Sequence, residues 1–227
     1  DNVISITSFL DGHYAKSSNR IILPPLVDLR ENKWNESENV PITSFPGVTL
    51  IYAGNSANSK DRIDVVLEAL IRVVNEGFRI RILLLGNCNQ ELLARYADCK
   101  TNILFLGKMP QKDVPSYYNV ADFSILIRDN TRKSKAGFST KLVESIASGI
   151  PPIINYTSDE SRYLSENTCI KLEDGGIESI IEALKQVCEM PKESRCVMRK
   201  RVKEVAVRHF DYRAYVNQMR KFIENIR

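Results

Sequence analysis

The sequence has 227 residues, of which 43% are hydrophobic and 26% are charged, and this composition excludes a disordered or fibrous chain. No apolar run approaches the roughly 18 residues that a membrane-spanning helix needs, and no secretory signal stands at the start. Since the first residue is Asp1 rather than Met, we expect the chain to be a processed or excised piece. The length suits one large α/β domain with additions.

The net charge of +4 is unevenly distributed. Residues 192–227 carry eleven Lys and Arg against four Asp and Glu, which gives +7, whereas the remainder carries 21 against 24, which gives −3. A basic segment of this kind suits lipid phosphate or nucleic acid, but the exposed surface of ordinary helices has the same composition. Both interpretations stay open at this point.

Cysteine and histidine are poorly placed for metal binding or nucleophilic catalysis. The five cysteines form no CxxC pair, and we interpret them as reduced thiols that pack like small hydrophobic residues. The two histidines, His13 and His209, lie away from Cys, Asp and Glu clusters. We therefore expect no metal site, no cofactor and no Ser–His–Asp triad.

The N-terminal part contains two strand-like fragments, at 3–9 and 20–23, which are too small for an independent core. Residues 30–43 are polar and are interpreted as a linker. From residue 48 onward, short β-branched segments alternate with helical patterns. Strands are predicted at 48–53, 80–85, 103–106, 122–127, 152–155 and 169–171. Helices are predicted at 61–75, 90–97, 112–119, 139–148 and 177–189, and a polar loop at 128–136.

Because these strands are almost uniformly apolar, the pattern predicts a parallel sheet that is covered on both faces, as in a Rossmann-like, doubly wound α/β domain. Asp122 stands at a helix-to-strand junction, where a structural role is expected. Two further helices are predicted after Pro191, at 193–208 and 211–226, and Asp211 is a suitable N-cap for the second.

In an open parallel sheet, ligands bind at the carboxyl ends of the strands, near helix N-termini. Neither a P-loop nor a GxGxxG fingerprint is present, and three other loops remain, at 54–61, 107–110 and 137–144. Lys60 stands at a helix start, where a lysine is unfavourable unless an anion lies nearby, although an ordinary surface lysine is the alternative. Ser139 and Thr140 offer backbone N–H groups to an anion, but a plain N-cap has the same sequence.

Four motifs recur at matching spacing in one known family. They are YAGN at 52–55 with Lys60 five residues after Asn55, FLG at 105–107, YYNVAD at 117–122, and GFSTKLVESIASGIP at 137–151. Together with LPPLVD at 23–28 and FDY at 210–212, they resemble the C-terminal donor-binding domain of a B-type glycosyltransferase of glycosyltransferase family 4. The last of the four motifs is the most specific.

This resemblance implies a division of the chain and a role for each loop. Residues 1–28 would be the end of an N-terminal acceptor domain, 29–47 an interdomain linker, 48–191 the donor-binding domain, and 192–227 helices that pack back on the domains. Lys60 and Glu144 would act in catalysis. The donor phosphates would lie against Asn55, Lys60, Gly137, Phe138, Ser139 and Thr140. Glu144 would bind the ribose, Lys108 and Met109 would meet the base, and no metal would be needed.

The sequence departs from the family pattern at two positions of the donor site. Ala136 stands where the family has the first of two glutamates eight positions apart, and Asn55 stands where it has a phosphate-binding arginine. The basic residues Arg132, Lys133 and Lys135 could supply the missing positive charge, and a solvated basic loop is the equal alternative.

By this resemblance the chain binds a nucleotide-diphosphate sugar, expected to be a UDP-sugar. The sugar would go, with retention of configuration, to a saccharide or lipid-linked acceptor in surface polysaccharide or glycoconjugate synthesis. We expect a cytoplasmic protein, peripheral on an anionic membrane surface, and inactive as this piece alone. The alternative is a non-catalytic nucleotide-binding partner or regulatory module. No nucleic-acid partner is expected, because the basic helices lack clustered aromatic residues and any known recognition motif.

Overall fold

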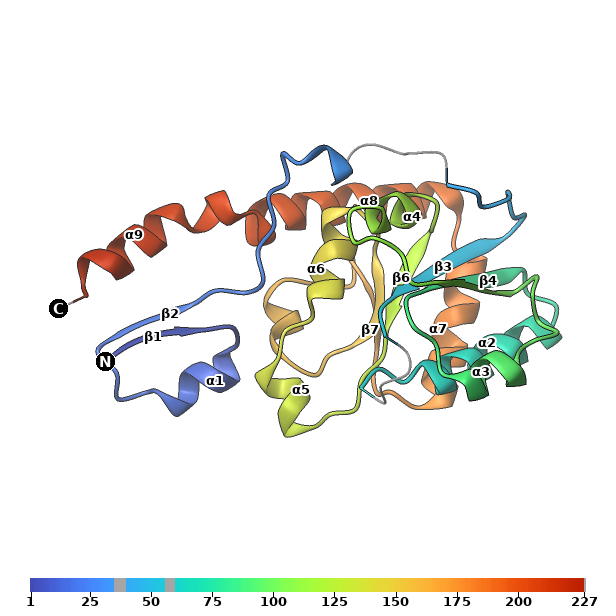
Figure 1. Cartoon of the computed structure of the whole chain (residues 1–227), viewed down its shortest axis with the longest axis horizontal. Coiled ribbons are helices and arrows are strands. Elements are labelled where there is room, and N and C mark those ends of the chain that lie inside the picture. The colour runs from blue at the N-terminus through green and yellow to red at the C-terminus, as the bar shows by residue number, and fades with distance from the viewer. Residues whose placement is uncertain (35–39, 56–59, 227) are drawn as a thin grey trace.

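The computed structural model describes residues 1–34, 40–55 and 60–226, and its centre is a six-stranded parallel sheet (Figure 1). The strand order is β5-β4-β3-β6-β7-β8. The strands are β3 (Val48–Ala53), β4 (Ile80–Leu85), β5 (Ile103–Gly107), β6 (Phe123–Leu126), β7 (Pro152–Asn155) and β8 (Ile170–Leu172). Every neighbouring pair is parallel, so the predicted doubly wound α/β fold is confirmed.

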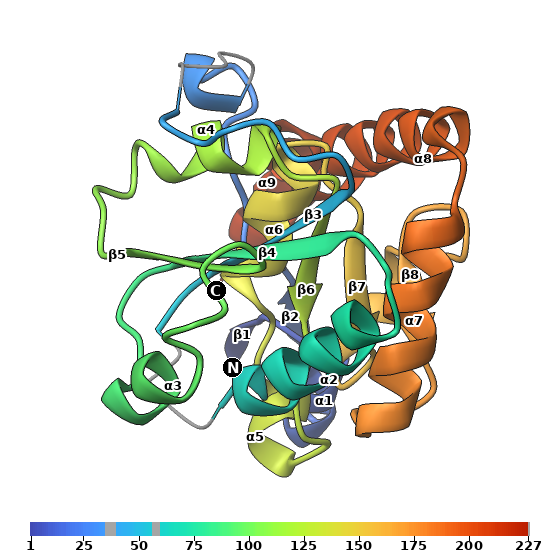
Figure 2. The same cartoon turned by 90° about the vertical axis from the view of Figure 1, so that its right-hand side faces the viewer.

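Helices cover both faces of the sheet, as Figure 2 shows. Since successive strand residues point to opposite faces, Leu50 and Ile82 enter one core, whereas Ile51 and Leu83 enter another. The first face carries α2 (Ile63–Asn75), α3 (Gln90–Arg95) and α7 (Ile177–Glu189). The second face carries α4 (Val114–Asn119), α6 (Thr140–Ala147) and α8 (Lys192–Val205). Burial on both faces explains why the strands are almost wholly apolar.

The N-terminal segment forms a small separate unit at the lower left of Figure 1. Two parallel strands, β1 (Asn2–Ser5) and β2 (Asn19–Ile22), flank the short helix α1 (Ser8–His13). The strand predicted at 3–9 is therefore wrong beyond Ser5. Its end is set by Thr7, whose hydroxyl accepts a hydrogen bond from the N–H of Leu10 at 3.2 Å and so caps α1.

This small unit is fastened to the main domain beside α5. The Ser8 backbone N–H and hydroxyl both donate to the carboxylate of Asp159, at 2.7 and 2.5 Å. The hydroxyl of Thr7 donates to the carbonyl of Ala136 at 3.4 Å. Asp159 belongs to η2 (Asp159–Arg162), the 3-10 turn that follows β7. The first turn of α1 therefore contacts the same region from which α6 begins.

Two segments that the sequence indicated as irregular contain helical turns. The predicted linker includes the 3-10 turn η1 (Asn32–Trp34), where the Trp34 indole N–H donates to the carbonyl of Asp28 at 2.8 Å and only 4% of the residue is exposed. Residues 35–39 of the linker lie outside the described part. The predicted loop at 128–136 contains α5 (Arg132–Ala136), because Thr131 accepts from the N–H of Ser134 at 3.1 Å and starts a turn.

The C-terminal region runs along the second face and then over the N-terminal unit. It consists of α8, the π-helical turn η3 (Ala206–Phe210), the 3-10 turn η4 (Tyr212–Tyr215) and α9 (Val216–Glu224). Asp211 accepts from the N–H of Arg213 at 2.9 Å, which confirms the predicted N-cap. No described helix is both long enough and apolar enough to span a bilayer.

Asp122 has the structural role that the sequence predicts. Its carboxylate accepts from the backbone N–H of Thr49 at 2.9 Å and pairs with Arg195 of α8 at 3.2 Å. It therefore joins the start of β3 to the C-terminal helices.

Candidate functional site

Three neighbouring strands end in glycine at one edge of the sheet. Gly54, Gly86 and Gly107 follow or close β3, β4 and β5, and their backbones are joined by two hydrogen bonds of 2.8 Å, from Gly54 to Leu85 and from Gly86 to Gly107. A Cβ atom added to Gly86 would lie 2.1 Å from the carbonyl oxygen of Gly54, so no larger residue fits there. These strand ends therefore form a floor of bare backbone that a ligand can approach closely.

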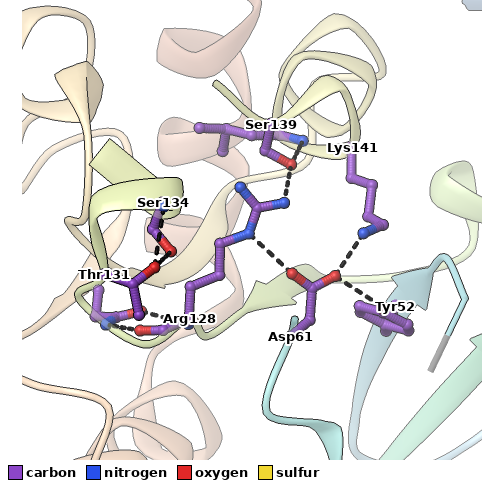
Figure 3. Close-up of polar contacts among 9 residues, drawn as sticks. Tyr52, Asp61, Arg128, Thr131, Ser134, Ser139 and Lys141 are labelled. Atoms are coloured by element: carbon purple, nitrogen blue, oxygen red, sulfur yellow. Dashed lines mark hydrogen bonds and ion pairs between the residues drawn. The ribbon is translucent and has the colours of Figure 1, made fainter. Parts of the chain in front are cut away.

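Beside this floor lies a buried ionic cluster built on Asp61 (Figure 3). The Asp61 carboxylate accepts from Arg128 Nε at 2.8 Å, from Lys141 Nζ at 2.5 Å and from the Tyr52 hydroxyl at 2.8 Å. The side chains of Asp61 and Arg128 are only 2% and 6% exposed, whereas that of Lys141 is 25% exposed. The cluster joins the ends of β3 and β6 to the start of α6.

Arg128 is held on every side. Its second guanidinium nitrogen donates to the hydroxyl of Ser139 at 3.2 Å, and Ser139 also caps α6 by accepting from the N–H of Leu142 at 3.4 Å. The Arg128 backbone exchanges two hydrogen bonds with the Asn155 amide, at 2.9 and 2.7 Å. The arginine therefore fixes the loop after β6 and the N-terminus of α6 relative to each other.

The electrostatic balance of this region is positive. Burial of Asp61 would raise its pKa, but the adjacent Lys141 and Arg128 outweigh that effect and hold the pKa below its ordinary value. The pKa of Lys60 is lowered, first by partial burial and then by repulsion from Arg128, Lys141 and Lys133. Four cationic side chains thus surround one carboxylate, and a further anion would be stabilised there.

Glu144 lies one helical turn further along α6 and faces a separate cavity. The cavity has a volume of about 350 Å³, and its lining includes Glu144, Thr140, Gln111 and the linker residues Asp28 and Lys33. Gln111 donates to the Glu144 carboxylate at 3.3 Å. Burial raises the pKa of Glu144, against the opposing effects of the Gln111 hydrogen bond, Lys33 and Lys141. The arrangement suits a neutral polyol beside an anionic group.

The predicted phosphate-binding residues do not all offer side chains to this region. Lys60 is exposed beside the ionic cluster, and Asn55 is exposed at the end of the glycine floor. Residues 56–59 of the predicted loop 54–61 lie outside the described part. Phe138 is 7% exposed, with its ring against Tyr163 and Phe210, so it can offer a ligand only its backbone, as can Gly137.

The predicted base-binding pair lies at the end of β5. Lys108 is exposed, whereas Met109 packs against the apolar cluster formed by β3, β4 and α4. Among the described residues, no three His, Cys, Asp or Glu side chains gather as a metal site requires. The roles of the predicted site residues, and the expected lack of a cofactor, stay predictions.

Sequence reasoning missed Asp61, Arg128 and Lys141 as members of the site. One signal was available for Lys141, which stands in the first turn of α6. The argument that indicated Lys60, a lysine at the positive end of a helix dipole, applies to Lys141 equally. Of the three basic residues considered as substitutes for the missing arginine, Lys133 is near enough to Lys60 to lower its pKa.

Comparison with known proteins identifies related sequences and folds. The family model described as "Glycosyl transferases group 1" matches residues 47–190, which is more than half of the chain. No curated protein sequence matches the chain significantly.

Solved structures match over nearly the whole chain at low sequence identity. A glycosyltransferase from Rickettsia africae matches with a TM-score of 0.79 and 12% identity over 100% of this chain and 64% of that chain. HepE of Anabaena, in complex with UDP and glucose, matches with a TM-score of 0.75 and 11% identity over 99% and 63%. TarM of S. aureus, in complex with fondaparinux, alpha-GlcNAc-glycerol and UDP, matches with a TM-score of 0.73 and 12% identity over 99% and 44%. The chain thus spans less than two thirds of these structures.

Proposed function

Because the chain belongs to the glycosyl transferases group 1 family, we propose that it binds the nucleotide-diphosphate sugar of a retaining glycosyltransferase, with a UDP-sugar as donor. The carrying observation is the excess of positive charge at the carboxyl ends of the strands, beside the N-terminus of α6 and next to the cavity that Glu144 faces. The presence of UDP in the HepE and TarM structures supports the choice of nucleotide. We assign the chain to glycosyltransferase family 4 on its four motifs.

The donor would lie across the glycine floor. Lys60 and the backbone N–H groups of Ser139 and Thr140 would hold the diphosphate and stabilise the charge that develops on the departing nucleotide. Glu144 would accept hydrogen bonds from the ribose hydroxyls, and Lys108 and Met109 would contact the base. Placing charged donors before the reaction begins lowers the barrier, because no reorganisation is then needed.

We further propose that the acceptor binds on a second domain, which covers the N-terminal unit and α9. An apolar groove of about 470 Å³ lies between the 23–26 segment and α9, and its lining includes Leu23, Leu26, Met219 and Ile223. Ile223 and Ile4 are 57% and 54% exposed, which suits surfaces that another domain covers. The acceptor would be a saccharide or a lipid-linked saccharide, reached from the cytoplasmic face of a membrane and used in polysaccharide or glycoconjugate synthesis.

UDP or a UDP-sugar is expected to raise the melting temperature of this chain. A ligand that binds only the folded state adds RT ln(1 + [L]/Kd), which is about 2.7 kcal/mol at one hundred times Kd. A thermal scan with UDP, ADP, GDP and their sugars at millimolar concentration measures the effect. No response to any of them would exclude the donor site, whereas a salt-dependent shift with RNA or DNA alone would favour a nucleic-acid binder.

A non-catalytic nucleotide-binding partner is the second candidate, and Ala136 and Asn55 are the observations that favour it. Transfer of sugar from the donor by a longer chain that includes the acceptor domain would exclude it. We expect no turnover from residues 1–227 alone, because the acceptor half of the cleft is not part of them.

A further inference from the structure

The side chain of Lys141 crosses the glycine floor. A Cβ atom added to Gly54 would lie 2.2 Å from Cε and 3.0 Å from Nζ of Lys141, so the aliphatic stem of the lysine rests directly on the Gly54 backbone. Its ammonium ends 2.5 Å from the Asp61 carboxylate and 5.4 Å from the centre of the Tyr52 ring. The charge of Lys141 is therefore held over the end of β3, between the floor and the start of α6.

The members of the Asp61 cluster differ in what they can offer a ligand. Arg128 is buried and already donates to Asp61 and Ser139. Lys141 is the partly exposed member, and its ammonium carries three N–H donors, of which Asp61 takes one. Asp61 is the carboxylate that Lys141 reaches within the described chain. The lysine is thus fixed at one donor while the same charge faces the opening.

We propose that Lys141 is a second diphosphate-binding residue, positioned by Asp61, and that it supplies the positive charge that Asn55 does not. This inference rests on the proposed function. A lysine in the first turn of a helix is stabilised by a neighbouring anion, and Asp61 provides one in the absence of ligand. A diphosphate above the floor would provide a second, on the side of the ammonium that Asp61 does not occupy.

The test compares UDP, UMP and uridine in isothermal titrations against the parent chain, Lys141→Met and Lys141→Gln. Both variants keep a stem over Gly54 but remove the charge. UDP binding is expected to weaken about 10- to 150-fold, the range for loss of a charge-assisted hydrogen bond. The loss for UMP is expected to be smaller, and uridine is expected to change less than twofold.

Lys135→Met is the matched control, because it removes the same charge from an exposed lysine of α5. UDP binding to this variant is expected to stay within threefold of the parent. Circular dichroism and a thermal scan establish that each variant is folded.

Each outcome decides between the two proposals. If the parent binds UDP and both Lys141 variants bind it equally well, the role of Lys141 is wrong and the proposed function stands. Equal losses for UDP and uridine also overturn the role, because they indicate a general distortion of the site. If the parent binds none of the three ligands, the proposed function falls and this inference falls with it.

Discussion

Replacement of Asp61 by alanine is expected to lower the free energy of unfolding by about 3–5 kcal/mol, the range for breaking a buried ion pair. The substitution would leave the Arg128 guanidinium, only 6% exposed, without its carboxylate, and would also remove the partners of Lys141 and Tyr52. For a chain of this size the melting temperature should fall by about 6–20 °C. Urea unfolding followed by circular dichroism measures the change.

An exposed ion pair provides the matched control. Asp129, whose side chain is 58% exposed, pairs with Arg62 at 3.5 Å on the surface. Asp129→Ala is expected to change the free energy of unfolding by no more than about 1 kcal/mol. Equal losses for the two variants would contradict the importance of the buried cluster.

The contribution of Asp61 also has a defined pH dependence. Its pKa is lower in the folded chain than the ordinary value of 3.8, so its stabilisation is fully present above about pH 4. The stabilisation is lost as the pH falls through the lower, folded-state pKa. The difference in unfolding free energy between the parent and Asp61→Asn should therefore be constant from pH 7 to about pH 4 and should shrink below it. A difference that grows towards acid pH would contradict this sign.

Lys60→Ala is expected to weaken UDP binding about 10- to 150-fold, through loss of a charge-assisted contact with the diphosphate. The loss for uridine should be much smaller, because the ammonium faces the phosphates and not the base. Isothermal titration of both ligands measures the two effects. If Lys60→Ala binds UDP as tightly as the parent, the diphosphate lies elsewhere, and the basic residues at 132–135 become the better candidates.

Glu144→Gln distinguishes the ribose site from the phosphate site. The amide keeps the shape but removes the charge that strengthens hydrogen bonds to hydroxyls, so UDP and uridine should weaken alike. Glu178→Gln on α7, where the side chain is 77% exposed, is the control and should change neither ligand. A Glu144 variant that binds both ligands like the parent would contradict the ribose role.

The central sheet could be predicted almost completely, because its strands are buried on both faces. β3, β4 and β7 begin and end at the predicted residues, since each is a short apolar run with no helical period. α7 likewise has its predicted bounds. In these elements local pattern and tertiary burial favour the same structure.

The errors occur where one polar side chain decides the local structure. Thr7 and Thr131 each accept a backbone N–H and start a short helix, at places where the apolar pattern indicated a strand and a loop. Trp34 is buried by contacts that are distant in sequence, and no periodicity reveals them. Tertiary contact determines the structure at these positions.

The candidate site could be predicted in part, and only through motifs. Lys60, Ser139, Thr140 and Glu144 lie on loops at the expected edge of the sheet. Asp61 and Arg128 were not predicted, because they are 67 positions apart and each is an ordinary charged residue in isolation. A buried pair of this kind becomes evident only when the pairing of the strands is known.

The strand order also affects the sequence of events in folding. β3 pairs on one side with β4, the next strand in the chain, and on the other side with β6, which follows only after β4 and β5. The longer closure costs more chain entropy and is expected to form later. A nascent chain folded only as far as β5 would already contain Lys60 and the three glycines of the floor, but neither Arg128 nor α6. The cationic site would therefore arise in one step, when the second half of the sheet docks along β3.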